Sequence, residues 1–195
     1  MENLDFKNAI ERLKDTDFNP HPDIVRISIP NAKYVLTRGL EHFLGKENVK
    51  WQPEYENIVE WLKDNRGRGL LCVGDCGRGK SLICTKIIPV VINFYYSKLV
   101  NVYDATDLNK NTDKILSSHL VCIDDLGTEN ELVDYGNRRI VFCELADLAE
   151  KKGKLLLLTT NLGEDELKKK YGERTIDRLH AITRKIVFRG NSLRG

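Results

Sequence analysis

A chain of 195 residues, 41% hydrophobic and 31% charged, is long enough and apolar enough to bury a core, which excludes a disordered protein. Charged residues begin at Glu2 and no apolar run approaches the length of a membrane span, so we expect a soluble cytoplasmic protein with no membrane partner. The formal net charge is only +2, but residues 151–195 carry 12 Lys and Arg against 5 Asp and Glu. This excess of basic residues is compatible with two interpretations. It can form a surface that binds phosphate or nucleic acid, or it can belong to ordinary solvated helix surfaces.

The first 50 residues are predicted to form a small extension. Apolar residues at helical spacing predict helices over 5–14 and 32–44, and the alternation in IVRISIP predicts a strand over 24–30. A glycine, a charge cluster and a proline in GKENVKWQP, residues 45–53, separate this region from the rest. We therefore expect an extension over 1–50 and a main domain over 51–195.

The main domain alternates between apolar strands and helices. Helices are predicted over 54–64, 80–98, 136–152, 164–170 and 174–179, with a kink or break at Pro89. Strands are predicted over 69–74, 99–105, 119–127, 154–161 and 185–190. Short strands that are apolar on both faces and alternate with helices are typical of a parallel sheet covered on both sides. The predicted fold class is therefore α/β, with a mostly parallel five-stranded sheet between helices.

A glycine-rich loop follows the first of these strands. Residues 74–81, GDCGRGKS, match the pattern GxxxxGK(S/T) and precede a predicted helix, as the P-loop mechanism requires. Glycines let backbone N–H groups turn inward around an anion, and the helix N-terminus adds its partial positive charge. The pattern predicts that ATP and Mg²⁺ are the cofactors. The candidate cofactor-binding residues are Gly74, Asp75, Cys76, Gly77, Arg78, Gly79, Lys80 and Ser81, with Ser81 also on the metal.

Two other predicted strands end in polar residues. LVCIDDLG ends in Asp124, which can hold Mg²⁺ through its water shell, and Asp125, which can polarise an attacking water. LLLLTTNL places Asn161 at the same edge of the sheet, where it can orient the water beside a γ-phosphate. Thr160 is a weaker candidate for that role. The residues alone favour the sensor role of Asn161 and a helix cap equally.

A pair of arginines lies near the C-terminal end of the chain. In YGERTIDRLHAI, residues 171–182, Arg174 and Arg178 are four residues apart and share a helix face. An arginine can act in trans on a nucleotide held by another subunit. The residues alone slightly favour an internal ion pair with Glu173 or Asp177.

In this order and spacing, the segments resemble AAA+ ATPases of the DnaC and IstB type, which are bacterial replicative-helicase loaders and related transposition ATPases. The resemblance is carried by RGLLCVGDCGRGKS, LVCIDDLGTE, LLLLTTNL, YGERTIDRL and the terminal FRGNSLR. It covers about residues 51–195. It implies a P-loop NTPase domain of the ASCE class of AAA+ proteins, without a C-terminal helical lid.

The resemblance also implies a role for each matching residue at the nucleotide. Lys80 and Ser81 would bind the phosphates and Mg²⁺, and Asp124 and Asp125 would form the acidic pair. Asn161 would sense the γ-phosphate. Such a protein would be an ATPase that is weak as an isolated subunit.

Partners are implied as well. Arg178 matches the trans-acting arginine of the family, with Arg174 as its neighbour, so ATP binding would assemble a homo-oligomer. Residues 1–50 would select a protein partner, expected to be a replicative helicase in DNA replication or mobile-element biology. Single-stranded DNA is a further candidate ligand. The ten residues 109–118, however, are shorter than the family's helical segment that often contacts it.

Two other functions fit the same motifs. A small-molecule P-loop kinase is compatible with the length of the chain, although it would need an arginine-rich lid and an acceptor pocket. An IstB-like transposition adaptor that binds ATP with little hydrolysis is compatible with Asp, rather than the longer Glu, at Asp125.

Overall fold

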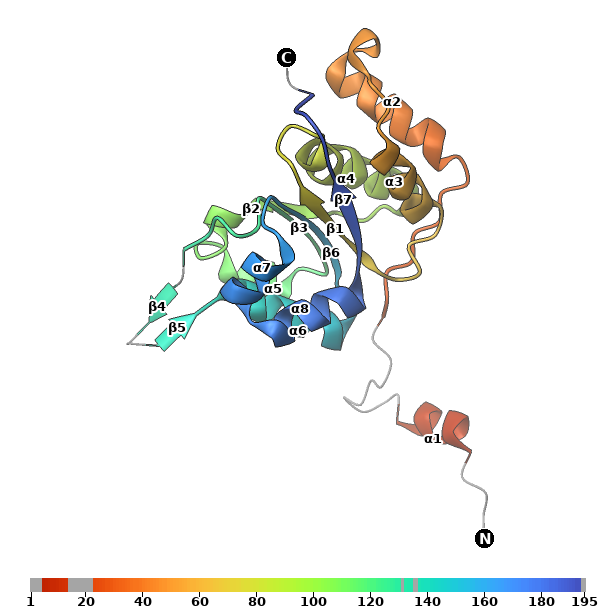
Figure 1. Cartoon of the computed structure of the whole chain (residues 1–195). Helices are drawn as coiled ribbons and strands as arrows, with labels where there is room; N and C mark the ends of the chain where they lie inside the picture. Colours follow the sequence, from red (N-terminus) through yellow and green to blue (C-terminus); the bar gives the residue numbers. More distant parts are fainter. Residues whose placement is uncertain (1–4, 14–22, 131, 135–136, 194–195) are drawn as a thin grey trace.

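The computed structural model describes residues 5–13, 23–130, 132–134 and 137–193 (Figure 1). Its centre is a parallel sheet with the strand order β2-β3-β6-β1-β7. The strands are β1 (Gly69–Gly74), β2 (Asn101–Asp104), β3 (Leu120–Asp124), β6 (Leu155–Thr160) and β7 (Thr183–Phe188). All four pairings within this sheet are parallel. The predicted five-stranded α/β sheet is therefore confirmed.

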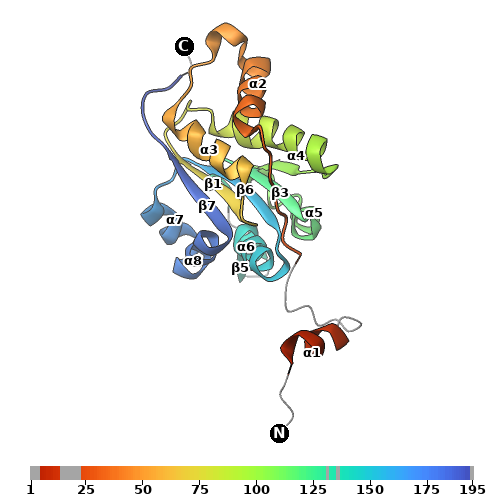
Figure 2. The same ribbon diagram turned by 90° about the vertical axis from the view of Figure 1, so that its right-hand side faces the viewer.

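Helices cover both faces of the sheet (Figures 1 and 2). One face packs against α2 (Ala32–Leu44), α3 (Pro53–Lys63), a π-helical turn (Leu82–Ile87) and α4 (Ile88–Tyr96). The other packs against α5 (Thr112–Ser117), α6 (Val141–Lys152), α7 (Glu164–Tyr171) and α8 (Glu173–Ile182). Short 3₁₀ helices cover Lys46–Asn48 and Ala105–Asp107. Within the described residues, no helix follows β7 and no helix is long and apolar enough to cross a membrane.

Two further elements lie outside these layers. The helix α1 (Phe6–Arg12) stands apart from the sheet in both views. The strands β4 (Leu132–Asp134) and β5 (Asn137–Arg139) pair antiparallel and project from the body after β3. The helix predicted over 136–152 therefore begins only at Val141, because residues 137–139 belong to this hairpin.

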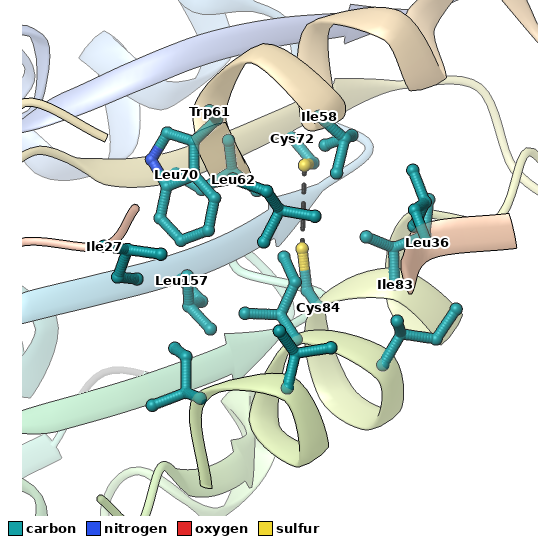
Figure 3. Close-up of a cluster of buried hydrophobic side chains, with 14 of the residues drawn as sticks. Ile27, Leu36, Ile58, Trp61, Leu62, Leu70, Cys72, Ile83, Cys84 and Leu157 are labelled. Carbon is teal, nitrogen blue, oxygen red and sulfur yellow. Dashed lines mark hydrogen bonds between the residues drawn. The ribbon is translucent and has the colours of Figure 1, made fainter. Parts of the chain in front are cut away.

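The core on the α2–α4 face is continuous from the N-terminal region to the sheet. Figure 3 shows Leu36 of α2, Trp61 of α3 and Ile83 pointing toward the strands, where all three are fully buried. Cys72 and Cys84 lie in the same cluster with their sulfur atoms 3.6 Å apart. Burial raises the pKa of Cys72 well above its usual value, so this thiol stays protonated and packs as a small apolar group.

The prediction of a strand over 24–30 is wrong. The alternation is real, since Val25, Ile27 and Ile29 are buried and the residues between them are exposed. The backbone, however, bonds to the end of α3 rather than to a strand. Ile27 N donates to Asn65 Oδ1 at 2.9 Å, and Ile29 N donates to Leu62 O at 2.9 Å. An extended segment that packs on one side shows the same period of two without joining a sheet.

The helix predicted over 80–98 ends at Tyr96. Of the kink or break predicted at Pro89, the break is absent, because the chain stays helical on both sides of the proline. The chain stays helical through a π-helical turn just before the proline, where Ile88 N donates to Ile83 O, five residues back. Pro89 then sits in the first turn of α4, where its missing N–H costs least. A local widening of the helix thus accommodates the proline.

The segment 25–44 shares the core of the main domain. Ala32, Leu36 and Leu40 of α2 are fully buried in the cluster that contains β1 and β6 residues. The division into an extension over 1–50 and a main domain over 51–195 therefore stays a prediction about function. The side chains of α2 pack in the same core as those of the sheet.

Truncating Leu36 therefore tests whether α2 unfolds together with the sheet. We expect Leu36→Ala to lower the free energy of unfolding by about 2–5 kcal/mol, because it leaves a cavity in the shared core. Lys33→Ala, on the exposed side of α2, is the matched control and is expected to cost at most about 1 kcal/mol. Urea denaturation followed by tryptophan fluorescence measures both. An unchanged midpoint for Leu36→Ala would show that α2 melts independently.

Candidate nucleotide-binding site

The glycine loop connects the carboxyl end of β1 to the helix that begins at Lys80. Gly74, Gly77 and Gly79 have φ values of +130°, +74° and +92°, which residues other than glycine rarely adopt. Space is restricted as well, because a Cβ on Gly77 would lie 2.1 Å from Ser192 Oγ. The loop therefore needs glycine for both conformation and close packing.

Lys80 connects this loop to the neighbouring strand. Its Nζ donates to Gly74 O at 2.8 Å, to Asp75 O at 2.7 Å and to Asn161 Oδ1 at 2.9 Å. Burial lowers the pKa of Lys80, while the negative groups nearby, among them Asp125, oppose this effect. An anion seated in the loop would stabilise the charged form further.

The two acids at the end of β3 are held by the next strand. Thr159, which is fully buried in β6, donates its hydroxyl to Asp124 Oδ1 and accepts the Asp125 backbone N–H at 3.0 Å. Asp125 has a φ of +53°, and Asn161 Nδ2 lies 3.4 Å from its Oδ1. The structure thus brings Lys80, Asp125 and Asn161 together. Thr159 was missed by sequence reasoning, because a threonine in an apolar strand is unremarkable there.

These groups surround one cavity of about 270 Å³. The loop residues Cys76–Ser81 line it together with Asp125 and Asn161. The rest of its lining combines the apolar Leu40, Leu44, Val49, Tyr55 and Leu193 with the polar Asn48 and Lys50. The cavity therefore combines cationic and polar groups with apolar side chains.

Two loop side chains point elsewhere. Arg78 is buried, and its guanidinium donates to Glu54 Oε1 at 2.6 and 3.0 Å and to Gln52 Oε1 at 2.7 Å. Asp75 Oδ2 accepts the backbone N–H of Gly190 at 2.9 Å. In this structure these side chains hold the loop against α3 and the C-terminal segment.

The C-terminal segment 189–193 forms one wall of the cavity. Leu193 N donates to Gly77 O at 2.9 Å, and Arg78 Nη1 donates to Asn191 O at 3.3 Å. Leu193 itself lines the cavity. The segment therefore holds the glycine loop in place through these two hydrogen bonds.

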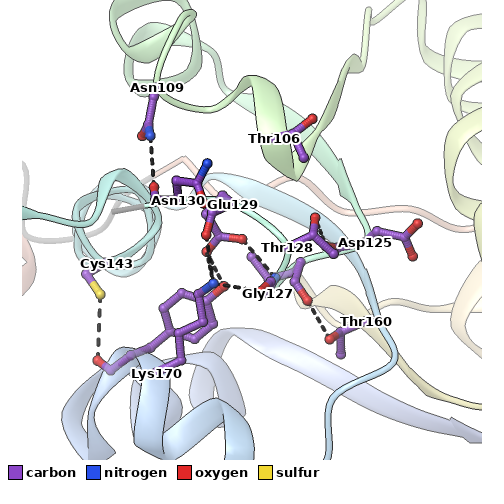
Figure 4. A network of polar contacts seen from close by, with 12 residues as sticks. Thr106, Asn109, Asp125, Gly127, Thr128, Glu129, Asn130, Cys143, Thr160 and Lys170 are labelled. Carbon is purple, nitrogen blue, oxygen red and sulfur yellow. Dashed lines mark hydrogen bonds and ion pairs between the residues drawn. The ribbon is translucent and has the colours of Figure 1, made fainter. Parts of the chain in front are cut away.

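Figure 4 shows how the loop that follows Asp125 is fixed. Glu129 is buried; one of its oxygens accepts Gly127 N at 2.8 Å and the other accepts the hydroxyl of Tyr171. Lys170 Nζ donates to Gly127 O at 2.6 Å and to Glu129 O at 2.8 Å. Burial is the main cause that raises the pKa of Tyr171, and the hydrogen bond to Glu129 raises this pKa further. This network ties the loop after the acidic pair to α7, and sequence reasoning missed it.

The two arginines of α8 do not line the cavity of their own subunit. Arg178 is largely buried; its Nη2 lies 2.7 Å from Asp147 Oδ1, and its Nε donates to Glu150 Oε2 at 2.9 Å. An internal ion pair is therefore present, with acids of α6. Arg174 is exposed, and among the described residues it forms no ion pair.

No protein-family model and no curated protein matches this sequence. Solved structures match it in fold. A DnaC helicase loader has a TM-score of 0.54 at 20% identity, over 87% of this chain and 93% of that chain. The chain has the DnaC-type AAA+ fold. Two further solved structures show the same fold. A putative primosome component from Streptococcus pyogenes serotype M3 has a TM-score of 0.52 at 15% identity, over 85% of this chain and 85% of that chain. DnaI has a TM-score of 0.51 at 15% identity, over 90% of this chain and 89% of that chain.

The DnaC-type fold confirms both the predicted α/β fold class and the resemblance to the DnaC type. In the sheet, β6 lies between β1, which leads into the glycine loop, and β3, which ends in the acidic pair. At 15–20% identity the likeness establishes the fold alone. The roles of the individual site residues remain proposals.

Replacing Thr159 tests whether its hydroxyl holds the acidic pair. Thr159→Val keeps the shape but leaves the Asp125 N–H and an Asp124 oxygen without their partner, so we expect a loss of about 1–3 kcal/mol in unfolding free energy. Thr159→Ser keeps the hydroxyl and is expected to cost less. Denaturant titration at neutral pH compares the two. A larger cost for serine than for valine would contradict this role.

Proposed function

We propose that this chain binds ATP with Mg²⁺ and hydrolyses it as an assembly switch in DNA replication or mobile-element biology, as a DnaC-like loader of a replicative helicase. The observation that carries the proposal is the convergence of Lys80, Asp125 and Asn161 on one cavity beside the glycine loop. These groups come from three strand ends that are far apart in sequence. The DnaC-type fold supports the loader assignment.

The polar groups of the cavity suit a triphosphate. The loop supplies backbone N–H groups and a helix N-terminus. Lys80 supplies a positive charge whose hydrogen-bond acceptors, within the described part of the chain, are carbonyl and amide oxygens. A phosphate would replace those acceptors with charged ones, which gives stronger hydrogen bonds. The apolar side chains in the lining, among them Leu40, Leu44 and Leu193, could pack against the base.

The donor set also fits Mg²⁺. The Ser81 hydroxyl and the Asp124 carboxylate are oxygen ligands of the kind Mg²⁺ prefers, and the ion usually keeps several waters. The described residues hold no cluster of three metal-binding side chains, so the phosphates would have to complete the coordination shell. When bound, the ion would neutralise charge that develops on the transferred phosphoryl group.

Asp125 and Asn161 are placed to act on the attacking water. Asp125 lines the cavity in a left-handed conformation, fixed through Thr159, and can accept a proton from that water. Asn161 contacts both Lys80 and Asp125, so it can orient the water relative to the γ-phosphate.

An arginine from a neighbouring subunit would complete the site. Neither Arg174 nor Arg178 reaches the cavity of its own subunit, which is consistent with a role in trans in an ATP-dependent homo-oligomer. Arg178 would first have to release Asp147 and Glu150, whereas Arg174 is already exposed. Arg174 is thus the more available of the two.

The remaining partners follow from the same proposal. Residues 1–50 would contact the helicase, single-stranded DNA is a further candidate ligand, and the protein would act in the cytoplasm. An IstB-like adaptor with little hydrolysis stays a second candidate, because the base is the short side chain of Asp125.

The trans role predicts that turnover depends on assembly. We expect ATPase activity per subunit to rise with protein concentration, and Arg174→Ala or Arg178→Ala to lower the assembled rate by at least about a hundredfold while ATP still binds. Lys80→Ala is expected to abolish binding itself. Lys168→Ala, on the exposed surface of α7, is the control. A rate that is independent of concentration and survives both arginine substitutions would exclude a trans-acting arginine.

The role of Asp125 separates hydrolysis from simple binding. Asp125→Asn should lower the hydrolysis rate by about 10²–10⁴-fold with little change in ATP affinity, because a general base is lost and the shape is kept. Single-turnover hydrolysis and equilibrium binding measure the two effects. An unchanged rate would remove Asp125 as the base and favour the adaptor.

A further inference from the structure

A buried ion pair anchors the middle of the glycine loop. The side chains of Arg78 and Glu54 are each only 8% exposed, and the guanidinium donates through both Nε and Nη2 to Glu54 Oε1. Burying two charges is costly, and apolar residues of similar volume often stabilise a protein as well as such a pair does. Stability is therefore a weak reason for this pair, and the position of its partners gives a better one.

The pair belongs to a larger set of contacts with the start of α3. Gln52, which directly precedes this helix, accepts a hydrogen bond from Arg78 Nη2 at 2.7 Å. Tyr55 donates its hydroxyl to the backbone carbonyl of Arg78 at 3.2 Å. A guanidinium is planar and presents its N–H groups in fixed directions, so several acceptors together define its orientation. The start of α3 therefore holds Arg78 by its side chain and by its backbone.

The same residue fastens the loop to the C-terminal segment. Arg78 Nη1 donates to Asn191 O at 3.3 Å, so all three nitrogen atoms of the guanidinium have acceptors within the protein. Two residues further along, Leu193 N donates to Gly77 O at 2.9 Å. Arg78 thus connects the loop to two segments that line the cavity, one through Tyr55 and the other through Leu193.

The backbone of the loop explains why it needs an anchor. Gly77 and Gly79 flank Arg78 with φ values of +74° and +92°, and glycine loses more conformational freedom on ordering than any other residue. If the loop were free to move, the phosphates would have to order it, and this cost would weaken their binding. A loop that the protein has already fixed avoids that cost. Anchoring Arg78 therefore favours anion binding without any contact between its side chain and the anion.

We propose that Arg78 is a positioning residue, which holds the glycine loop in its phosphate-binding shape through the ion pair with Glu54. This role rests on the proposed function, because it concerns the same nucleotide site. ATP affinity then depends on Glu54, which is not among the described residues that line the cavity and whose negative charge would repel a phosphate. Direct contact between Arg78 and a phosphate would give Glu54 no such role.

Calorimetric titration of the full chain with ATP and Mg²⁺ tests this dependence. Glu54→Gln and Arg78→Lys are each expected to weaken ATP binding at least about tenfold, because neither keeps the charged, forked contact. The loss in affinity should exceed any loss in single-turnover rate at saturating ATP, which is the reverse of the pattern expected for Asp125→Asn. Glu60→Gln is the matched control, because Glu60 lies on the same helix in an exposed pair with Lys63.

A double variant separates positioning from stability. Arg78→Met combined with Glu54→Leu removes both buried charges, and replacing a buried pair with apolar residues often leaves stability unchanged or raised. The double variant is therefore expected to fold, with a urea midpoint near that of the parent, and to bind ATP at least about tenfold more weakly. Binding of ATP with the affinity of the parent would overturn the proposal.

Amide exchange without nucleotide, followed residue by residue by NMR, reports on the loop itself. The Leu193 N–H is bonded to Gly77 O in the intact loop. Glu54→Gln should speed exchange at this amide at least about tenfold and leave the amides within β1 unchanged, because only the anchor of the loop is weakened. An equal rise within β1 would indicate general destabilisation and would count against a positioning role. This measurement requires no ATP.

The binding results also distinguish this role from the proposed function. If affinity falls in Arg78→Lys but not in Glu54→Gln, Arg78 contacts the phosphates directly and the positioning role is wrong. A parent that binds ATP, with the same affinity in both single variants, would overturn the positioning role alone. A parent that binds no ATP would overturn the proposed function as well.

Discussion

The candidate site depends on one constraint of the sheet, which is the position of β6 between β1 and β3. Because these strands are parallel, their carboxyl ends meet at one edge: β1 ends in the glycine loop, β3 in Asp124 and β6 just before Asn161. The register sets Val73 beside Thr160 and Ile123 beside Leu158. Lys80 can therefore reach Asn161, and Thr159 can hold both acids. A different strand order would separate these groups.

The sequence predicted the central parts of this arrangement for clear physical reasons. Buried parallel strands are apolar on both faces, and polar residues at their carboxyl ends must gather at a common edge. That reasoning found the loop, Asp125 and Asn161, which line one cavity, while Asp124 ends β3 and bonds to Thr159. It could not locate Glu129, whose role depends on Tyr171 42 residues later in the sequence. It also could not find the ion-pair partners of Arg178, which lie on α6 rather than on its own helix.

The N-terminal region shows where periodicity stops being informative. Residues 24–30 alternate as a strand does, but a period of two reports only which side is buried, whereas a strand also needs a partner backbone. In this chain the partners are Asn65 and Leu62 at the end of α3. The helical pattern of α1 was predicted correctly up to its C-terminal boundary, yet nothing in the sequence indicates what its apolar stripe contacts. Only the folded body, with Gly39 packed on Ile87, reveals the groove between α2 and α4.

The central claim, that a magnesium-bound triphosphate occupies the glycine loop, is tested most directly by a crystal structure with a non-hydrolysable ATP analogue and Mg²⁺. The account predicts that Lys80 Nζ leaves Gly74 O and Asp75 O for the terminal phosphates. It also predicts Ser81 and Asp124 around the metal, with Asn161 beside the γ-phosphate. A nucleotide bound elsewhere, or a loop in which Lys80 keeps its two carbonyl partners beside the bound analogue, would contradict it.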